Sequence, residues 1–178
     1  ARGGVRTAER RQRQRGIGAR GETVVIDAAY VEEHIGDLAK NIAKRSLAIA
    51  DESHPKPLMS GIRHMVELAL QQLKEVLDAY AERDADKAMA VWRNDAQIDA
   101  MYNSLFRELL TYMMEDPRNI TFSTHLLFAA KNIERVGDHA TNIAETIYYL
   151  AKGEPLREQR PKGDSSSFTP ADFPQTND

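Results

Sequence analysis

Acidic side chains at helical spacing are the residues of this sequence best suited to chemistry. Glu134, Asp138 and Asn142 follow one another at intervals of four residues, and Asp95 and Asp99 repeat that interval in an earlier segment. Residues four apart lie on one face of an α-helix, with a drift of about 40° per step. Each set therefore predicts a polar stripe along one helix.

The turn between the two segments decides whether the stripes meet. Residues 115–119 include Pro117 and predict a tight connection between two antiparallel helices. Residues at equal distances before and after such a turn lie level with one another. This geometry places Asp99 beside Glu134 and Asp95 beside Asp138, so four carboxylates would converge.

Converging carboxylates call for a cation, because like charges in a partly desolvated groove repel one another or must take up protons. Oxygen ligands suit magnesium, calcium, manganese or iron better than a structural zinc, although zinc also accepts carboxylates. We therefore predict a metal site with Asp95, Asp99, Glu134 and Asp138 as ligands, and with Asn142 as a further ligand or a partner of the ligands. A single acidic stripe is more typical of a solvated helix face.

Two histidines and three aromatic residues give weaker indications. His125 and His139 could add nitrogen ligands, with a core position for His125 and an exposed one for His139 as the alternatives. Trp92, Tyr102 and Tyr112 lie at helical spacing, and we expect them to pack in the core rather than to bind a ligand.

Helical periodicity extends over most of the chain. Apolar residues recur at spacings of three to five in segments 24–50, 58–80 and 120–150, and in a segment that follows the connection 84–86 and reaches residue 113. Pro55 and Pro57 predict a break after the first segment, and Gly153 predicts the end of the last. No segment alternates with a period of two, so we predict an all-α fold of antiparallel helical bundles.

Composition narrows the classes of function. The chain has no cysteine, which excludes disulfides and thiolate metal sites, and its net charge of −3 gives no reason to expect nucleic-acid binding. No apolar run approaches the roughly 20 residues that cross a bilayer, so a cytoplasmic location is expected. Residues 1–22 carry seven arginines and predict a disordered head, with a basic arm as the alternative, and residues 154–178 predict a disordered tail.

An internal repeat links the start of the helical region to its end. Segments 33–43 and 134–144 are identical at seven of eleven positions, including the glutamate, aspartate and asparagine of the acidic stripe. This identity indicates a duplicated helical unit. Gly36 and Gly137 are equivalent in the repeat, and glycine inside a helix is less favourable than alanine by about 1 kcal/mol, so we expect close packing there.

The repeated motifs resemble the PhoU family, whose hallmark is a repeated Glu/Asp-x-x-x-Asp pattern. The resemblance covers residues 33–153 and extends to segments 98–102 and 110–117 around the motifs. The motif positions carried over are Asp95 with Asp99, Glu134 with Asp138, and Glu33 with Asp37.

The resemblance implies a fold and a role. It implies two symmetrical three-helix bundles, multinuclear iron on their surfaces (or zinc, manganese or magnesium), and a homodimer. It also implies a non-catalytic regulator that represses the phosphate-starvation response through the ATPase of the phosphate ABC transporter and a sensor histidine kinase. Membrane association is then expected only through these partners. The alternative is a carboxylate-bridged di-metal enzyme, but such bundles use Glu-x-x-His pairs, which Glu134 and Glu145 lack.

The resemblance is incomplete before Glu33, where the family would place two more helices and another acidic pair. We therefore expect residues 23–54 to form the last helix of an incomplete first repeat, and residues 56–153 to form a complete second repeat. A metal site at Glu33 and Asp37 is a weaker expectation, because its partner helix is missing from this sequence.

Overall fold

The described part of the protein is helical throughout. The computed structural model describes residues 31, 33–50 and 56–158, so the predicted head at 1–22, most of the predicted tail and Pro55 lie outside the described residues. Within these ranges every regular element is a helix, which confirms the all-α prediction.

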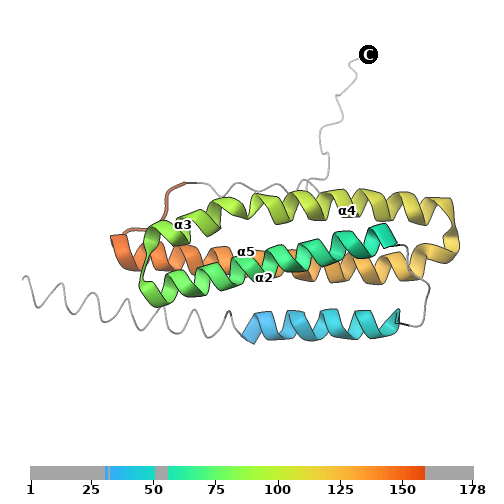
Figure 1. Ribbon diagram of the computed structural model, residues 1–178, viewed down its shortest axis with the longest axis horizontal. Coiled ribbons are helices and arrows are strands. Elements are labelled where there is room, and N and C mark those ends of the chain that lie inside the picture. Colours follow the sequence, from blue (N-terminus) through green and yellow to red (C-terminus); the bar gives the residue numbers. More distant parts are fainter. Residues whose placement is uncertain (1–30, 32, 51–55, 159–178) are drawn as a thin grey trace, which may run out of the picture.

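Four helices and one helical turn follow the first described helix, which spans residues 33–48. They are α2 (Lys56–Glu82), α3 (Ala85–Asn94), α4 (Ala96–Glu115), the 3₁₀ turn η1 (Pro117–Asn119) and α5 (Ile120–Lys152). Figure 1 shows the long helices side by side along one axis, with helix 33–48 running along one edge of the bundle. Helices α2 and α5 contact each other and both contact α3 and α4, so these two helices form the centre of the bundle.

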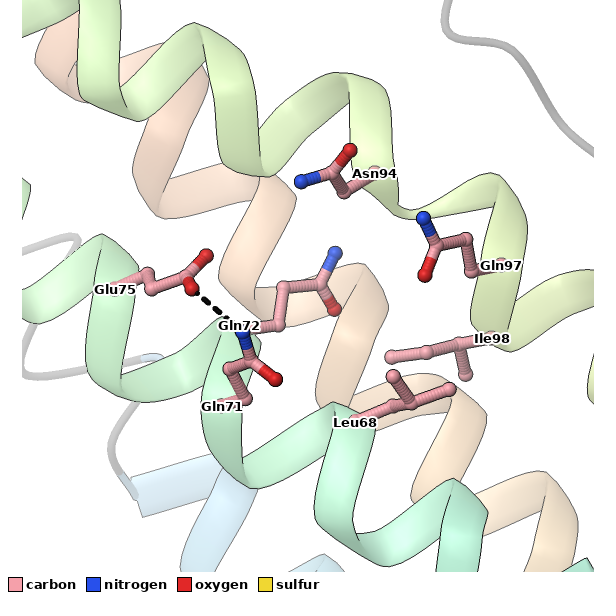
Figure 2. A pocket seen from close by; sticks show the side chains of 7 residues that line it. All are labelled: Leu68, Gln71, Gln72, Glu75, Asn94, Gln97 and Ile98. Carbon is pink, nitrogen blue, oxygen red and sulfur yellow. Dashed lines mark hydrogen bonds between the residues drawn. The ribbon is translucent and has the colours of Figure 1, made fainter.

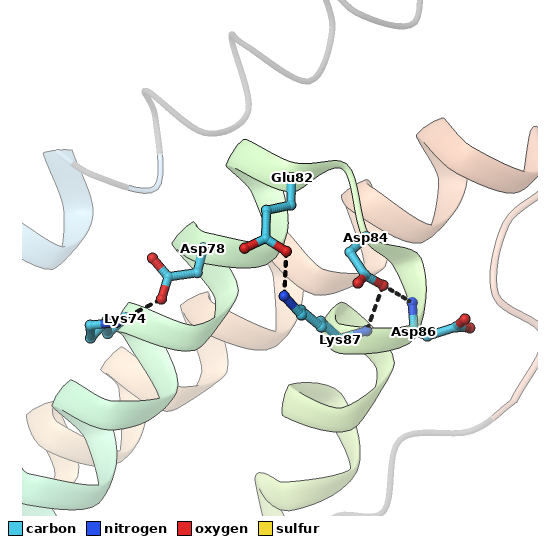
Figure 3. A network of polar contacts seen from close by, with 6 residues as sticks. All are labelled: Lys74, Asp78, Glu82, Asp84, Asp86 and Lys87. Carbon is cyan, nitrogen blue, oxygen red and sulfur yellow. Dashed lines mark hydrogen bonds and ion pairs between the residues drawn. The ribbon is translucent and has the colours of Figure 1, made fainter.

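Local signals fix the ends of these helices. Asp84 caps α3, because its carboxylate accepts hydrogen bonds from the backbone N–H groups of Asp86 and Lys87, both at 3.0 Å (Figure 3). Asp116 accepts a bond from the backbone N–H of Arg118 and closes the turn into α5. Gly153 ends α5 in the left-handed conformation, with φ of 79°.

One predicted helix is divided into two. The apolar pattern after residue 86 predicts a single helix, but the structure separates α3 from α4 at Asp95. The backbone N–H groups of Ile98 and Asp99 both donate to the carbonyl of Asp95, at 3.0 and 3.3 Å. This sharing tightens the turn while Asp95 keeps helical dihedrals, so the break needs no glycine or proline.

The core consists of two apolar clusters along α5. One cluster joins α2, α4 and α5 through residues that include Met65, Leu105, Leu109, Phe122 and Leu126. The other joins α2, α3 and α5 through residues that include Val76, Trp92, Ile143 and Ile147. Trp92 and Tyr102 are buried, as expected for packing residues, and Tyr112 is partly buried.

Helix 33–48 packs antiparallel against α5. The rings of His34 and His139 lie 5.7 Å apart between centroids, and the guanidinium of Arg45 lies 4.3 Å from the ring centroid of Phe128. His34, near the start of helix 33–48, lies beside His139 in the second half of α5. Arg45, near the end of helix 33–48, lies beside Phe128 in the first half of α5. The two copies of the repeat therefore run past each other in opposite directions.

Candidate metal site

Glu134 and Asp99 are buried where α5 and α4 meet. Only 4% of Glu134 and 3% of Asp99 is exposed, while Asp138, one turn further along α5, is partly exposed. Burial is the largest cause that raises the pKa of Glu134, and the charges of Asp138 and Asp99 raise it further. Asp99 and Asp138 thus lie close enough to Glu134 for their charges to act on it.

Lys131 supplies a positive charge to this cluster. Its Nζ donates to Oε1 of Glu134 at 2.9 Å, and it lies 4.8 Å from the ring centroid of Tyr102. This hydrogen bond opposes the rise in the pKa of Glu134. The other carboxylate oxygen, Oε2 of Glu134, is buried and has no hydrogen-bond partner. A buried acceptor without a partner is uncommon in folded proteins and points to a missing donor or cation.

Asp95 is held by an amide from α2. It is 1% exposed, and Nε2 of Gln72 donates to its Oδ1 at 3.3 Å and to the carbonyl of Val91 at 3.3 Å. A Cβ atom built on Gly137 would lie 3.1 Å from this Oδ1. Asp95 is therefore level with Gly137, one residue before the position expected from the turn.

The amide of Gln72 also borders a small cavity between α2 and the junction of α3 with α4 (Figure 2). The cavity has a volume of about 50 Å³, which suits a few water molecules. Its lining is mostly carboxamide: Leu68, Gln71, Gln72, Glu75, Asn94, Gln97 and Ile98. Glu134 and Asp99 do not line it, so the cavity is separate from the acidic cluster.

The remaining predicted ligands are exposed or only partly buried. Asn142 is exposed on α5, and Glu33 and Asp37 are exposed on helix 33–48. His125 and His139 are partly exposed, although the Nδ1 atom of each is buried without a hydrogen-bond partner. Burial, followed by the charges of His34 and Arg135, lowers the pKa of His139.

The donor set fits a metal chemically, but its present arrangement is not that of a formed site. Among the described residues, no three histidine, aspartate or glutamate side chains stand close enough together to hold an ion. The buried carboxylate of Glu134, with one unsatisfied oxygen, is nevertheless a ligand that a hard cation prefers. The metal site stays a prediction that requires a shift of side chains.

Three interactions around the site were not predicted from the sequence. Lys131 stands three residues before Glu134, a spacing at which helical side chains meet, and this signal was available. The contact of Gln72 with Asp95 joins residues far apart in the chain and had no local signal. Glu145 accepts a hydrogen bond from Nε1 of Trp92 at 2.8 Å, so its carboxylate is paired with a buried core residue.

None of the helices in the described ranges is sufficiently long and apolar to span a bilayer.

Comparisons with known proteins give one consistent match. The PhoU domain matches residues 62–147. A Rhizobium meliloti protein named phosphate-specific transport system accessory protein PhoU homolog is 63% identical over 135 residues, which are 76% of this chain and 57% of the relative. A Caulobacter vibrioides homolog of the same name is 53% identical over 132 residues, or 74% of this chain and 57% of its own length. The chain thus spans little more than half the length of these relatives.

Solved structures agree with the sequence matches. A crystal structure of PhoU from Pseudomonas aeruginosa has a TM-score of 0.74 and 36% identity, over 78% of this chain and 66% of that one. The phosphate transport system regulatory protein PhoU from Streptococcus pneumoniae has a TM-score of 0.73 and 27% identity, over 80% of this chain and 67% of that one.

Proposed function

This chain belongs to the PhoU family, and we propose that it is an accessory protein of a phosphate-specific transport system that represses the phosphate-starvation response. The observation that carries the proposal is the 63% identity to a relative named for that transport system. The proposal concerns a whole protein of the relatives' length, because this chain spans 57% of the relatives that it matches.

We propose that the protein works as a non-catalytic adaptor in the cytoplasm. Its partners would be the ATPase of the phosphate ABC transporter and the phosphate sensor histidine kinase, with a second copy of the chain completing a homodimer. Names such as accessory and regulatory protein among the relatives support an adaptor role. The alternative di-metal enzyme loses support because no histidine stands three residues after Glu134 or Glu145, as the ligand pairs of such bundles require.

We further propose that the adaptor binds metal ions between α4 and α5. Glu134, Asp99 and Asp138 would hold the ion, with Asp95 and Asn142 near it. The unsatisfied Oε2 of Glu134 supports this assignment. A bound cation would neutralise the buried carboxylates and join two helices of the bundle. Iron in a multinuclear centre is the expected metal, with zinc, manganese and magnesium as alternatives.

A pull-down with purified components tests the adaptor role. The protein should retain the ATPase of the phosphate transporter and the cytoplasmic part of the sensor kinase, and should not retain the ATPase of an unrelated ABC transporter. Equal retention of both ATPases, or of neither, would contradict the proposal.

Metal analysis tests the site separately. The purified protein should carry metal, and the double variant Asp99→Ala with Glu134→Ala should carry much less. The exposed pair Lys74 and Asp78, joined at 2.7 Å on α2, offers the control, because Asp78→Ala should not change the metal content. Equal metal content in the wild type and the double variant would rule out the site.

A further inference from the structure

Lys131 is placed as a cation inside the acidic cluster. Its ammonium group bonds to a glutamate that is 96% buried, and it lies over the face of a buried tyrosine. The face of an aromatic ring attracts cations, so Tyr102 stabilises the ammonium on a second side. These contacts hold a positive charge in a position where a ligand carboxylate would need to meet a metal.

The lysine offsets a charge that the fold would otherwise leave unpaired. Removing a carboxylate from water is strongly unfavourable unless a counter-charge accompanies it. Glu134 loses nearly all of its solvent, and Lys131 provides a charge-assisted hydrogen bond to Oε1. The ammonium group thus partly neutralises the carboxylate of Glu134, as a bound metal ion would.

Lys131 also has a way out of the cluster. About 36% of its side chain is exposed, compared with 4% for that of Glu134. A flexible stem with an exposed end can turn its ammonium into water without moving the backbone. Glu134 has no comparable freedom, because both of its neighbouring turns pack in the core.

We propose that Lys131 is an internal competitor of the metal: its ammonium group neutralises Glu134 in the metal-free protein and must move into solvent before an ion can bind. The inference rests on the proposed metal site. An ammonium group inside the acidic cluster explains why the carboxylates lie near one another although no three of the described ligand residues are arranged to hold an ion. Lys131 therefore sets the affinity for metal and couples binding to the exposure of one lysine.

Manganese binding to three purified chains tests the proposal. The chains are the wild type, Lys131→Met and the control Lys74→Met, and free Mn²⁺ is measured by electron paramagnetic resonance during titration. Lys74 is an exposed lysine paired with a carboxylate four residues away (Figure 3), so its replacement removes the same charge at a distance from the site. We expect Lys131→Met to lower the Kd for Mn²⁺ at least ten-fold, and Lys74→Met to change it less than two-fold.

The outcomes separate the two ideas. Binding by the wild type and Lys131→Met with the same Kd would overturn the role of Lys131 and leave the metal site standing. Absence of Mn²⁺ binding in all three chains would overturn the metal site itself. Circular dichroism of each variant verifies that it is folded.

A second measurement needs no variant. The wild type is treated with a lysine-acetylating reagent with and without Mn²⁺, and modification at each lysine is followed by mass spectrometry. Release from Glu134 should increase the rate at Lys131 several-fold on adding the ion, while the rate at Lys74 should stay constant. An unchanged or slower rate at Lys131 would overturn the proposal even if the substituted chain did not fold.

Discussion

Alanine at the two equivalent glycines of the repeat should have opposite effects on stability. Gly36 is exposed, and a Cβ atom added there would meet no atom within 4 Å. Alanine is favoured over glycine inside a helix by about 1 kcal/mol. Gly36→Ala should therefore raise the free energy of unfolding by about that amount.

Gly137→Ala should gain the same helix propensity but lose more through crowding. The new Cβ atom would lie 3.0 Å from Oε1 of Gln72, 3.1 Å from Oδ1 of Asp95 and 3.1 Å from Cδ1 of Ile98. None of these groups retreats easily, because all three side chains are buried and Gln72 is hydrogen-bonded to Asp95. Forcing an extra methyl group into a packed site costs about 1–3 kcal/mol. A net destabilisation of about 1 kcal/mol is expected.

The comparison of the two variants isolates the crowding. Urea unfolding of the metal-free chains gives a free energy for each variant, and the difference between them cancels the helix-propensity gain that both share. Gly137→Ala should be less stable than Gly36→Ala by about 1–3 kcal/mol. Equal stability of the two variants would refute the close approach of α2 and α4 to α5 at this glycine.

Three further predictions concern charged and polar groups. Burial raises the pKa of Glu134 above its ordinary 4.5, so the folded chain holds this proton more tightly than the unfolded chain does. The free energy of unfolding of the metal-free protein should therefore fall as the pH rises from 4.5 through the raised pKa. Glu134→Gln should flatten that decline in urea unfolding at several pH values, and an unchanged slope would contradict the assignment. Burial lowers the pKa of His139 below 6.5, so stability should fall as the pH drops from 6.5 through the lowered value, and His139→Gln should remove this loss. Trp92→Phe should lower the free energy of unfolding by about 1.5–3 kcal/mol, because it removes the hydrogen bond to Glu145. Glu145→Gln keeps an acceptor and should lower it less, with both variants measured by thermal unfolding.

Much of the fold could be predicted from local patterns because several helix ends carry a recognisable residue in the sequence. Asp84 has the side chain that caps a helix, and Gly153 has the backbone freedom that ends one. The break at Asp95 could not be predicted in this way, because its dihedral angles are those of a helix and the apolar pattern continues through it. Only the local hydrogen bonding changes there, and that depends on how α3 and α4 meet α5.

The sequence indicated which acidic residues to propose as ligands, but not the side chains that hydrogen-bond to them. The spacing of Asp99 and Glu134 from the turn is enough to bring them together. Gln72 comes from another helix and no spacing rule connects it with Asp95. Lys131 was within reach of the rule that joins helical residues three apart, but the rule does not say that the pair is buried.

The break between α3 and α4 has an electrostatic consequence for the carboxylates. Because α4 begins at Ala96, Asp99 lies in its first turn, where the peptide dipoles present their positive end. In one continuous helix the same residue would lie in the middle, where those dipoles cancel. A negative charge near a helix start is stabilised by about 0.3–1 kcal/mol, and by up to about 2 kcal/mol when partly buried. The interrupted backbone thus places the start of a helix, rather than the middle of one, beside a buried aspartate.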